Sequence, residues 1–327
     1  NNIHSKPNIF FPMTFEQAVE KFEYDKMYNL NLIANTEVVF RRLKIKNENL
    51  DEKNYLKLLE KIYNIGDFRQ TRNAKTKSLF GERLEFDLKD KFPLITTKKM
   101  FLRGIFEELL WFLRGDTDSK ILEAKKVKIW KFNTTKEFID DMGLSYREGD
   151  IGNMYGFQWK HNGAEYNGCD NNYTGKGFDQ IKYCLDLLKK DKYSRRIIMT
   201  TYSPYNAHQG VLYPCHGLMT QWYVREENNI NYLSCHMYQR SADMFLGVPF
   251  NISSYSLLTY MFCNVLNNSE DYDGLEFKPD KLVISFGDLH IYEQHFEQVN
   301  EQIKRLPFNF PKLKIKKELS NLSGLNS

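Results

Sequence analysis

The sequence predicts an α+β fold built on one main antiparallel or mixed β-sheet. Segments with strand-like alternation and segments with helical periodicity both occur, but they do not follow one another in regular β-α-β order. The chain has 327 residues, of which 42% are hydrophobic and 15% aromatic. That composition suffices for one large domain with a packed core. The sequence contains no internal repeat and no low-complexity tract.

The N-terminal third predicts an extension followed by helices and a strand. Residues 1–47 form an N-terminal extension or linker, in which residues 13–16 resemble a helix start and residues 38–43 a strand. Residues 49–66 carry apolar side chains at helical spacing and end in a glycine, which predicts an amphipathic helix. We expect a polar loop at 67–77, a strand at 78–88 and the most apolar helix of the chain at 101–114.

The later segments alternate between turns, strands and helices. A glycine-rich turn at 149–159 runs into aromatic residues and has neither Walker spacing nor a GxGxxG pattern, which excludes those nucleotide loops. Further segments complete the fold. We expect a short helix ending at 142, helices at 179–190, 252–266 and 293–306, and strands at 197–202, 232–238, 282–286 and flanking 214–216.

Charge and cysteine content exclude several classes of protein. The net charge of +4 is far below that of a general nucleic-acid binder. The five cysteines are odd in number and show no CxxC pair or zinc-ligand spacing, which favours a reducing compartment and hence the cytoplasm. No apolar run approaches the roughly 20 residues of a membrane span, and no signal peptide opens the chain.

Three features are candidate functional sites on the basis of their residue types alone. In Pro214-Cys215-His216, a thiol at a fixed direction is a candidate nucleophile, although many free cysteines are only small buried hydrophobes. Of Glu107 and Glu108 in the apolar helix, one can face solvent and the other would lie near the core, where a carboxylate is often functional. The paired arginines at 195–196 suit phosphate binding or remain solvated.

A series of linked motifs runs along the chain. The motifs are Phe92-Pro93-Leu94-Ile95-Thr96-Thr97-Lys98, Glu108-Leu109-Leu110-Trp111-Phe112, Ile129-Trp130, Tyr155-Gly156-Phe157-Gln158-Trp159, Arg195-Arg196, Pro214-Cys215-His216, Tyr238-Gln239-Arg240-Ser241, Asp243, Gly247-Val248-Pro249-Phe250-Asn251 and Gly287-Asp288-x-His290-x-Tyr292. In their order and spacing these motifs resemble those of thymidylate synthases. The match covers roughly residues 49–314, and any one motif would be weak evidence.

The resemblance implies a reaction, a fold and an assembly. The reaction is reductive methylation of dUMP to dTMP, with 5,10-methylenetetrahydrofolate as co-substrate and no metal. The implied fold is a single large mixed β-sheet layered with helices, with one sheet face packed in a homodimer. On this view residues 48–318 are the catalytic domain. Residues 319–327 are a C-terminal tail in which the family's closing segment is not recognised.

The family's catalytic roles fall on six residues. Cys215 would add to carbon 6 of uracil, with Arg240 favouring its thiolate. Glu108 would manage proton transfers through water, within a polar network that includes Tyr155 and His216. The catalytic set implied by the resemblance is Cys215, Glu108, Tyr155, His216, Asp243 and Arg240.

The ligand sets follow from the same motifs. Asn251 would read the uracil edge, whereas an aspartate there would suggest a dCMP enzyme. Arg195 and Arg196 would reach the phosphate bound to the partner subunit. The implied dUMP set is Arg72, Arg195, Arg196, Gln239, Arg240, Ser241, Asn251, His290 and Tyr292. The implied folate set is Lys98, Trp130, Asn133, Asp243 and Gly247.

The chain departs from the family's pattern near these sets. The family's phosphate loop Asp-Arg-Thr-Gly-x-Gly corresponds to residues 70–76, QTRNAKT, where both glycines are missing; Arg69 or Lys75 could substitute for a displaced Arg72. Gly-Pro-Val-Tyr has become Gly152-Asn153-Met154-Tyr155. Two alternatives therefore stay open. One is a dUMP hydroxymethylase, in which water replaces hydride. The other is a weakly active or non-catalytic nucleotide- or RNA-binding homologue. A reductase domain could precede the chain, because some members are bifunctional dihydrofolate reductase–thymidylate synthases.

Overall fold

The structure is a computed structural model that describes residues 49–71, 74–316, 318–319 and 321–322. The expected helix start at 13–16, the expected strand at 38–43 and Arg72 lie outside the described residues. No helix in the described part of the chain is long and apolar enough to cross a membrane.

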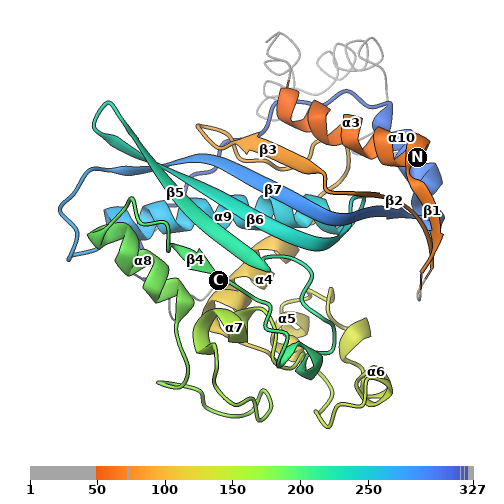
Figure 1. Ribbon diagram of the computed structural model, residues 1–327, viewed down its shortest axis with the longest axis horizontal. Helices are drawn as coiled ribbons and strands as arrows, with labels where there is room; N and C mark the ends of the chain where they lie inside the picture. Colours follow the sequence, from red (N-terminus) through yellow and green to blue (C-terminus); the bar gives the residue numbers. More distant parts are fainter. Residues whose placement is uncertain (1–48, 72–73, 317, 320, 323–327) are drawn as a thin grey trace, which may run out of the picture.

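A seven-stranded mixed sheet organises the molecule, as the sequence predicts (Figure 1). Its strand order is β1-β2-β7-β6-β5-β4, and β3 also pairs with β7. Every pairing is antiparallel except that of β6 with β7, which is parallel. The strands are β1 Asp67–Gln70, β2 Lys75–Phe80, β3 Arg83–Asp87, β4 Ile198–Met199, β5 Met219–Glu227, β6 Ile230–Asp243 and β7 Phe277–Tyr292.

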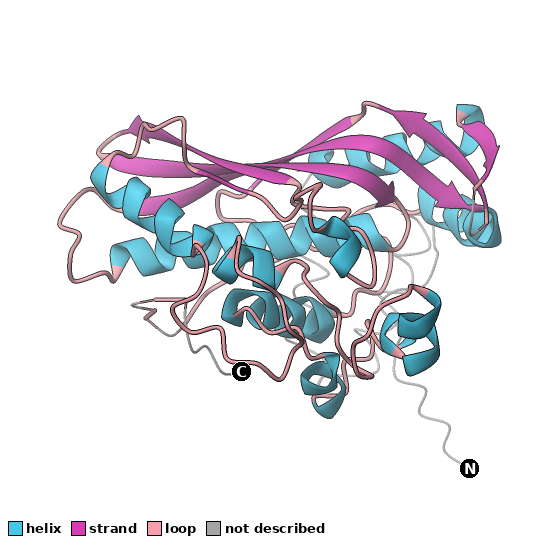
Figure 2. Ribbon diagram, turned by 60° about the horizontal axis from the view of Figure 1, so that its bottom comes forward, coloured by secondary structure: helices cyan, strands magenta, loops and turns pink. Residues whose placement is uncertain are grey.

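The helices gather on one face of this sheet (Figure 2). Helix α9, Gly247–Asn267, packs against β6 and β7, and α4, Leu102–Arg114, packs against α9. Because α9 is covered by sheet and helices together, its sequence is apolar nearly all round rather than on one stripe. The remaining helices are α3 Leu50–Ile65, α5 Ser119–Ala124, η2 Phe132–Thr134, α6 Lys136–Asp141, α7 Gly156–His161, α8 Gln180–Lys190, η3 Ala207–Gln209, η4 Glu293–His295 and α10 Phe296–Ile303.

The prediction of a polar loop over residues 67–77 is wrong. Residues 67–70 form β1 and residues 75–77 begin β2, and the two strands make an antiparallel hairpin in which Gln70 pairs with Lys75. All four residues of β1 are exposed, because β1 is the edge strand and buries neither face. A strand of this kind has no hydrophobic alternation, so its sequence cannot be distinguished from that of a loop.

Other boundaries differ in ways that matter for the site. The expected strand around Pro214-Cys215-His216 begins only at Met219, so Cys215 lies in the loop that enters β5. The single strand expected at 78–88 is two strands separated at Gly81, which has a φ of 81°. Helix α9 begins five residues before the expected start at 252 because the Gly247-Val248-Pro249 turn is already helical.

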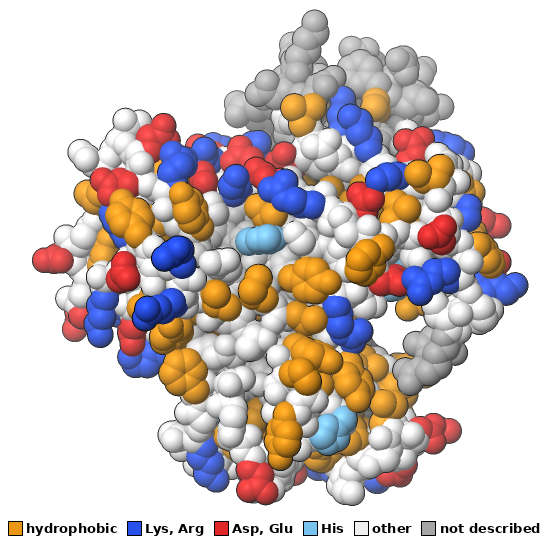
Figure 3. Space-filling model, viewed as in Figure 1, with side chains coloured by type: hydrophobic (Ala, Val, Ile, Leu, Met, Phe, Trp, Pro, Cys, Tyr) orange, Lys and Arg blue, Asp and Glu red, His pale blue; other side chains and the backbone are white. Residues whose placement is uncertain are grey.

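Within the described residues, the other face of the sheet carries no helix, and Figure 3 shows apolar side chains scattered across that side of the molecule. Along β5 alternate residues point outward, among them Met219 and Tyr223, which are 41% and 66% exposed. On the neighbouring strand β6 His236 is also exposed. This face therefore leaves several apolar and aromatic side chains exposed to solvent.

Candidate active site

Hydrogen bonds to the backbone N–H and carbonyl of Cys215 fix the position of its thiol. The Cys215 N–H donates to the hydroxyl of Tyr155 (3.1 Å), and its carbonyl accepts from the N–H of Arg240 (2.9 Å). The Tyr155 hydroxyl also lies 3.3 Å from the Cys215 sulfur. Two residues later Gly217 has a φ of 63°, and a Cβ there would lie 2.1 Å from the Tyr255 hydroxyl, so only glycine fits. The loop therefore presents a partly exposed sulfur in one orientation.

Arg240 borders the thiol through the same loop. Its Nε donates to the carbonyl of Pro214 (2.8 Å) and its Nη2 to that of Tyr213 (2.9 Å). Burial raises the pKa of the Cys215 thiol, whereas the hydrogen bond from Tyr155 and the charge of Arg240 lower it. Burial has the larger effect, so the sulfur is protonated at neutral pH. The expected influence of Arg240 is therefore present, but it does not by itself make the thiolate the main form.

His216 and Tyr155 form a stacked pair beside the thiol. Their rings lie 4.4 Å apart at 16°, and His216 Nδ1 is 3.1 Å from the hydroxyl of Tyr255. Burial lowers the pKa of His216 to about 3, so this imidazole is neutral and takes part as a hydrogen-bonding group. Sequence reasoning missed Tyr255, because a tyrosine inside the apolar pattern of α9 gives no signal of its own.

The two glutamates of α4 have different surroundings. Glu107 is buried and paired with Lys125 at 2.8 Å, so it does not face solvent. Glu108 accepts a hydrogen bond from the indole of Trp130 (2.8 Å). Burial raises the pKa of Glu108 to about 7, against the lowering effect of that hydrogen bond. A carboxyl that titrates near neutral pH can both give and accept protons, which suits the role expected for Glu108.

The expected nucleotide residues from β6, α9 and β7 come together beside this centre. Gln239 donates to the Asn251 side-chain oxygen (3.1 Å), which connects β6 with α9. The parallel register places Ser241 opposite Asp288 and Asp243 opposite His290. His290 Nδ1 lies 3.0 Å from Asp288, and the rings of His290 and Tyr292 are 5.2 Å apart.

The arginines expected at the phosphate are not gathered in this way. Arg195 and Arg196 are exposed next to β4, and neither guanidinium forms an ion pair within the residues that the structure describes. Arg69, considered as a substitute for Arg72, is instead paired with Asp288 at 2.6 Å. It therefore belongs to the His290 end of the site in this structure.

The folate residues form two groups. In the first, Lys98 donates to the Phe245 carbonyl (2.6 Å), and burial lowers the pKa of Lys98 to about 8. Asp243 accepts from the N–H groups of Phe245 and Leu246, each at 3.0 Å, just before Gly247 opens α9. In the second group, Trp130 lies next to Glu108, and Asn133 follows in η2.

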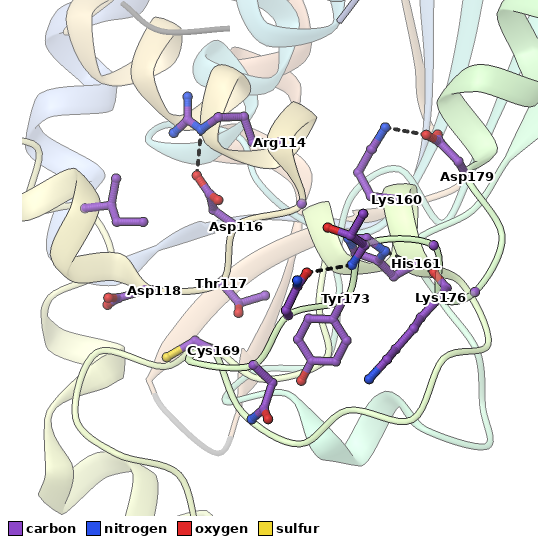
Figure 4. A pocket seen from close by; sticks show the side chains of 17 residues that line it. Arg114, Asp116, Thr117, Asp118, Lys160, His161, Cys169, Tyr173, Lys176 and Asp179 are labelled. Carbon is purple, nitrogen blue, oxygen red and sulfur yellow. Dashed lines mark hydrogen bonds and ion pairs between the residues drawn. The ribbon is translucent and has the colours of Figure 1, made fainter. Parts of the chain in front are cut away.

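A separate polar pocket of about 560 Å³ lies between the start of α5 and the 169–179 loop (Figure 4). Two ion pairs lie in its lining, Arg114 with Asp116 at 2.7 Å and Lys160 with Asp179. None of the residues expected at the active site lines this pocket. The described residues contain no group of three or more His, Cys, Asp or Glu side chains that could hold a metal ion.

The described residues form a mixed sheet with helices on one face, and they place the Cys215 thiol beside Tyr155, His216 and Arg240. Comparison with known proteins is specific. The family model for thymidylate synthase matches residues 53–326. A thymidylate synthase of Saccharomyces cerevisiae is 45% identical over 84% of this chain and 90% of its own length, and that of Homo sapiens is 42% identical over 84% of each. A bifunctional dihydrofolate reductase-thymidylate synthase of Paramecium tetraurelia is 46% identical, and this chain spans 56% of it. The chain belongs to the thymidylate synthase family.

Proposed function

We propose that this chain is a methyltransferase that converts dUMP to dTMP with 5,10-methylenetetrahydrofolate, and that Cys215 is its nucleophile. The observation that carries the proposal is the contact of the Cys215 sulfur with Tyr155, beside Arg240, in a chain of this family. The comparisons support methyl transfer and give no support to the hydroxymethylase or RNA-binding alternatives.

The chemistry begins at the sulfur. Carbon 5 of uracil is a poor nucleophile until a bond forms between the Cys215 sulfur and carbon 6, which moves the ring's π electrons onto carbon 5 and the carbonyl at carbon 4. The thiol proton passes to solvent water as the sulfur–carbon bond forms, and the Tyr155 hydroxyl at 3.3 Å stabilises the thiolate. Bound methylenetetrahydrofolate supplies the carbon unit and the hydride. Glu108, with a pKa of about 7, exchanges protons with the ring through water.

dUMP is held at three points. Arg240 uses its Nε and Nη2 for loop carbonyls, which leaves further guanidinium N–H groups for the phosphate beside Ser241. Asn251, oriented by Gln239, pairs with the uracil edge.

His290 and Tyr292, on one side of β7, bind the ribose hydroxyl. Asp288 accepts from Nδ1 of His290 and so orients the ring. Arg72 completes the phosphate set.

Folate is held on the other side of the thiol. Trp130 stacks on the pterin, and its N–H keeps it fixed to Glu108. Asp243 accepts from pterin nitrogens, with Asn133 and Gly247 lining the same side. Lys98 meets the negatively charged tail of the folate, and its partial burial strengthens that attraction.

The active form is a homodimer, paired through the helix-free sheet face. Two observations support this arrangement. That face exposes Met219, Tyr223 and His236. Arg195 and Arg196 are exposed next to β4, the last strand of the sheet. In the dimer these arginines reach the phosphate bound to the partner subunit. We place the enzyme in the cytoplasm. Sedimentation equilibrium tests the assembly: a monomer at micromolar concentration that is still fully active would disprove it.

Incubation with dUMP and methylenetetrahydrofolate tests the reaction. We expect the absorbance of dihydrofolate to rise and the nucleotide mass to increase by one methyl group in place of hydrogen. A product heavier by one further oxygen would establish the hydroxymethylase instead. Cys263→Ala, which removes a buried thiol of α9, is the matched control for Cys215→Ala.

A further inference from the structure

The loop that carries Tyr155 is joined along its length to the segment that leads to Cys215. Gly152 and Gly210 form an isolated antiparallel bridge, and the Val211 N–H donates to the Ile151 carbonyl (3.0 Å). A Cβ at Gly152 would lie 2.1 Å from the Gln209 carbonyl, so the two backbones are in direct contact. The position of Tyr155 relative to the thiol therefore depends on this junction.

Asn153 is the buried side chain at the centre of that junction. It is 2% exposed, and its Nδ2 donates to Gln209 Oε1 (2.9 Å). Its own N–H donates to the Gln209 carbonyl (3.3 Å), and its Oδ1 accepts from the amide of Gln158 in α7. Gln158 in turn accepts from Asn162 (2.7 Å). In the family's Gly-Pro-Val-Tyr motif a proline takes the place of Asn153. Because proline has neither an N–H nor an amide side chain, it could not form these hydrogen bonds.

Tyr155 needs such an anchor because its backbone is strained. Its φ and ψ are 35° and −96°, outside the regions that residues with a Cβ normally occupy. A conformation of this kind persists only where the surroundings fix it. From these contacts we propose that Asn153 is a positioning residue for the nucleophile, which holds the Tyr155 hydroxyl against the Cys215 sulfur by pinning the 150–154 loop to Gln209 and Gln158. This inference rests on the proposed role of Cys215 and Tyr155.

The reactivity of the sulfur reports on that position. Tyr155 donates to the thiolate form, so displacement of its hydroxyl should raise the pKa of the thiol. The other groups that face the sulfur keep their side chains when Asn153 is replaced. Those groups are Arg240 from β6, Glu108 from α4, Tyr255 from α9, Tyr292 from β7 and the neutral His216 beside it.

The experiment measures alkylation of Cys215 by iodoacetamide across pH, with the modified peptide quantified by mass spectrometry. The thiolate displaces iodide to form the carbon–sulfur bond, and the thiol proton goes to the buffer. For Asn153→Ala we expect the midpoint of the rate profile to move to higher pH by about half a unit to one unit, as in Tyr155→Phe. We also expect kcat to fall about tenfold while the KM for dUMP changes less than about twofold. In the Tyr155→Phe background, Asn153→Ala should produce no further shift of the midpoint.

Asn267→Ala is the matched control, because Asn267 also bridges two segments by its amide, to both backbone groups of Phe277, far from the thiol. It should lower the unfolding temperature without moving the midpoint. Gln209→Ala removes only the partner of the Asn153 amide, and it replaces Asn153→Ala if that variant does not fold. An unmoved midpoint in both variants, while Tyr155→Phe moves it, overturns the role of Asn153 and leaves the proposed site intact. A midpoint that Tyr155→Phe itself does not move overturns the role of Tyr155 together with this inference.

Discussion

The two ends of the site are built differently. Around the thiol, Tyr155 lies within hydrogen-bond distance of Cys215, at 3.1 and 3.3 Å, and stacks on His216. His216 in turn lies 3.1 Å from the Tyr255 hydroxyl. At the phosphate end, Arg195 and Arg196 are exposed and make no ion pair within the described residues. The contacts around the thiol are therefore already formed within one chain, whereas on our proposal the phosphate end is completed by the ligand and a second subunit.

This difference has an electrostatic reason. A nucleophile must be held to a fraction of an ångström, which requires packed neighbours on every side. A phosphate with about two negative charges needs several guanidinium groups, and like charges gathered in one empty site would repel one another. In the proposed dimer, two of the arginines come from the partner subunit, which avoids that cost until the dimer and the ligand are present. Each of the following variants affects one end only.

Loss of the nucleophile should have the largest effect. Cys215→Ala removes the atom that bonds to carbon 6, so we expect kcat to fall by at least about 10³-fold. Binding of dUMP, measured by calorimetry, should persist within about threefold, because the phosphate end is untouched. Cys263→Ala should keep nearly full activity. If dUMP binding also disappears in Cys215→Ala, the two ends are not independent.

Glu108 should have the next largest effect. Glu108→Gln keeps an oxygen that can accept from Trp130 but cannot transfer protons, so kcat should fall by about 10²-fold. The profile of kcat against pH should lose an inflection near pH 7. Glu107→Gln is the adjacent control, and it should lower the unfolding temperature through its contact with Lys125 while the inflection remains. An inflection that survives in Glu108→Gln would assign it to another group.

The raised pKa of Glu108 also has a consequence for stability. Between its ordinary pKa of 4.5 and about 7 the folded protein binds this proton more tightly than the unfolded chain. The free energy of unfolding should therefore decrease as pH rises through that window. Glu52 in α3 is also buried, with a pKa raised to about 7, and contributes in the same direction. Glu108→Gln should remove part of this slope, and the remainder should persist.

At the phosphate end the effect should be smaller and should depend on the partner. Loss of one charge-assisted hydrogen bond costs about 1.5 kcal/mol or more, so Arg196→Ala should raise the KM for dUMP about tenfold. Arg225→Ala, on β5 but paired with Glu227 and Asp280, is the control and should leave this KM unchanged. Mixed dimers of Cys215→Ala with Arg195→Ala/Arg196→Ala should regain activity, because one of their two sites has both intact parts. No regain would show that these arginines serve their own subunit.

The sequence predicted the mixed sheet, because apolar periodicity leaves a local signal along the chain. The roles of Cys215 and Glu108 come from linked motifs and stay predictions. The sequence did not predict the strand at 67–70, since an exposed edge strand has no alternation. Nor could it reveal that Asn153 meets Gln209 or that Tyr255 meets His216. These contacts join residues far apart in the chain, and buried amides or tyrosines have no pattern that indicates their partners.

Substitution of Lys98 should have the smallest effect, and it tests whether this charge acts on folate binding alone. Lys98→Met keeps most of the side-chain volume but removes the charge, so we expect the KM for methylenetetrahydrofolate to rise about three- to tenfold with little change in the KM for dUMP. Burial lowers the pKa of Lys98 to about 8, so the wild-type KM for folate should rise as pH increases through 8, whereas that of Lys98→Met should stay flat. The exposed neighbour Lys99 supplies the control variant Lys99→Met. A pH dependence that remains in Lys98→Met would mean that the folate tail is held by charges elsewhere, and that Lys98 serves only to fix the Phe245 carbonyl beside Asp243.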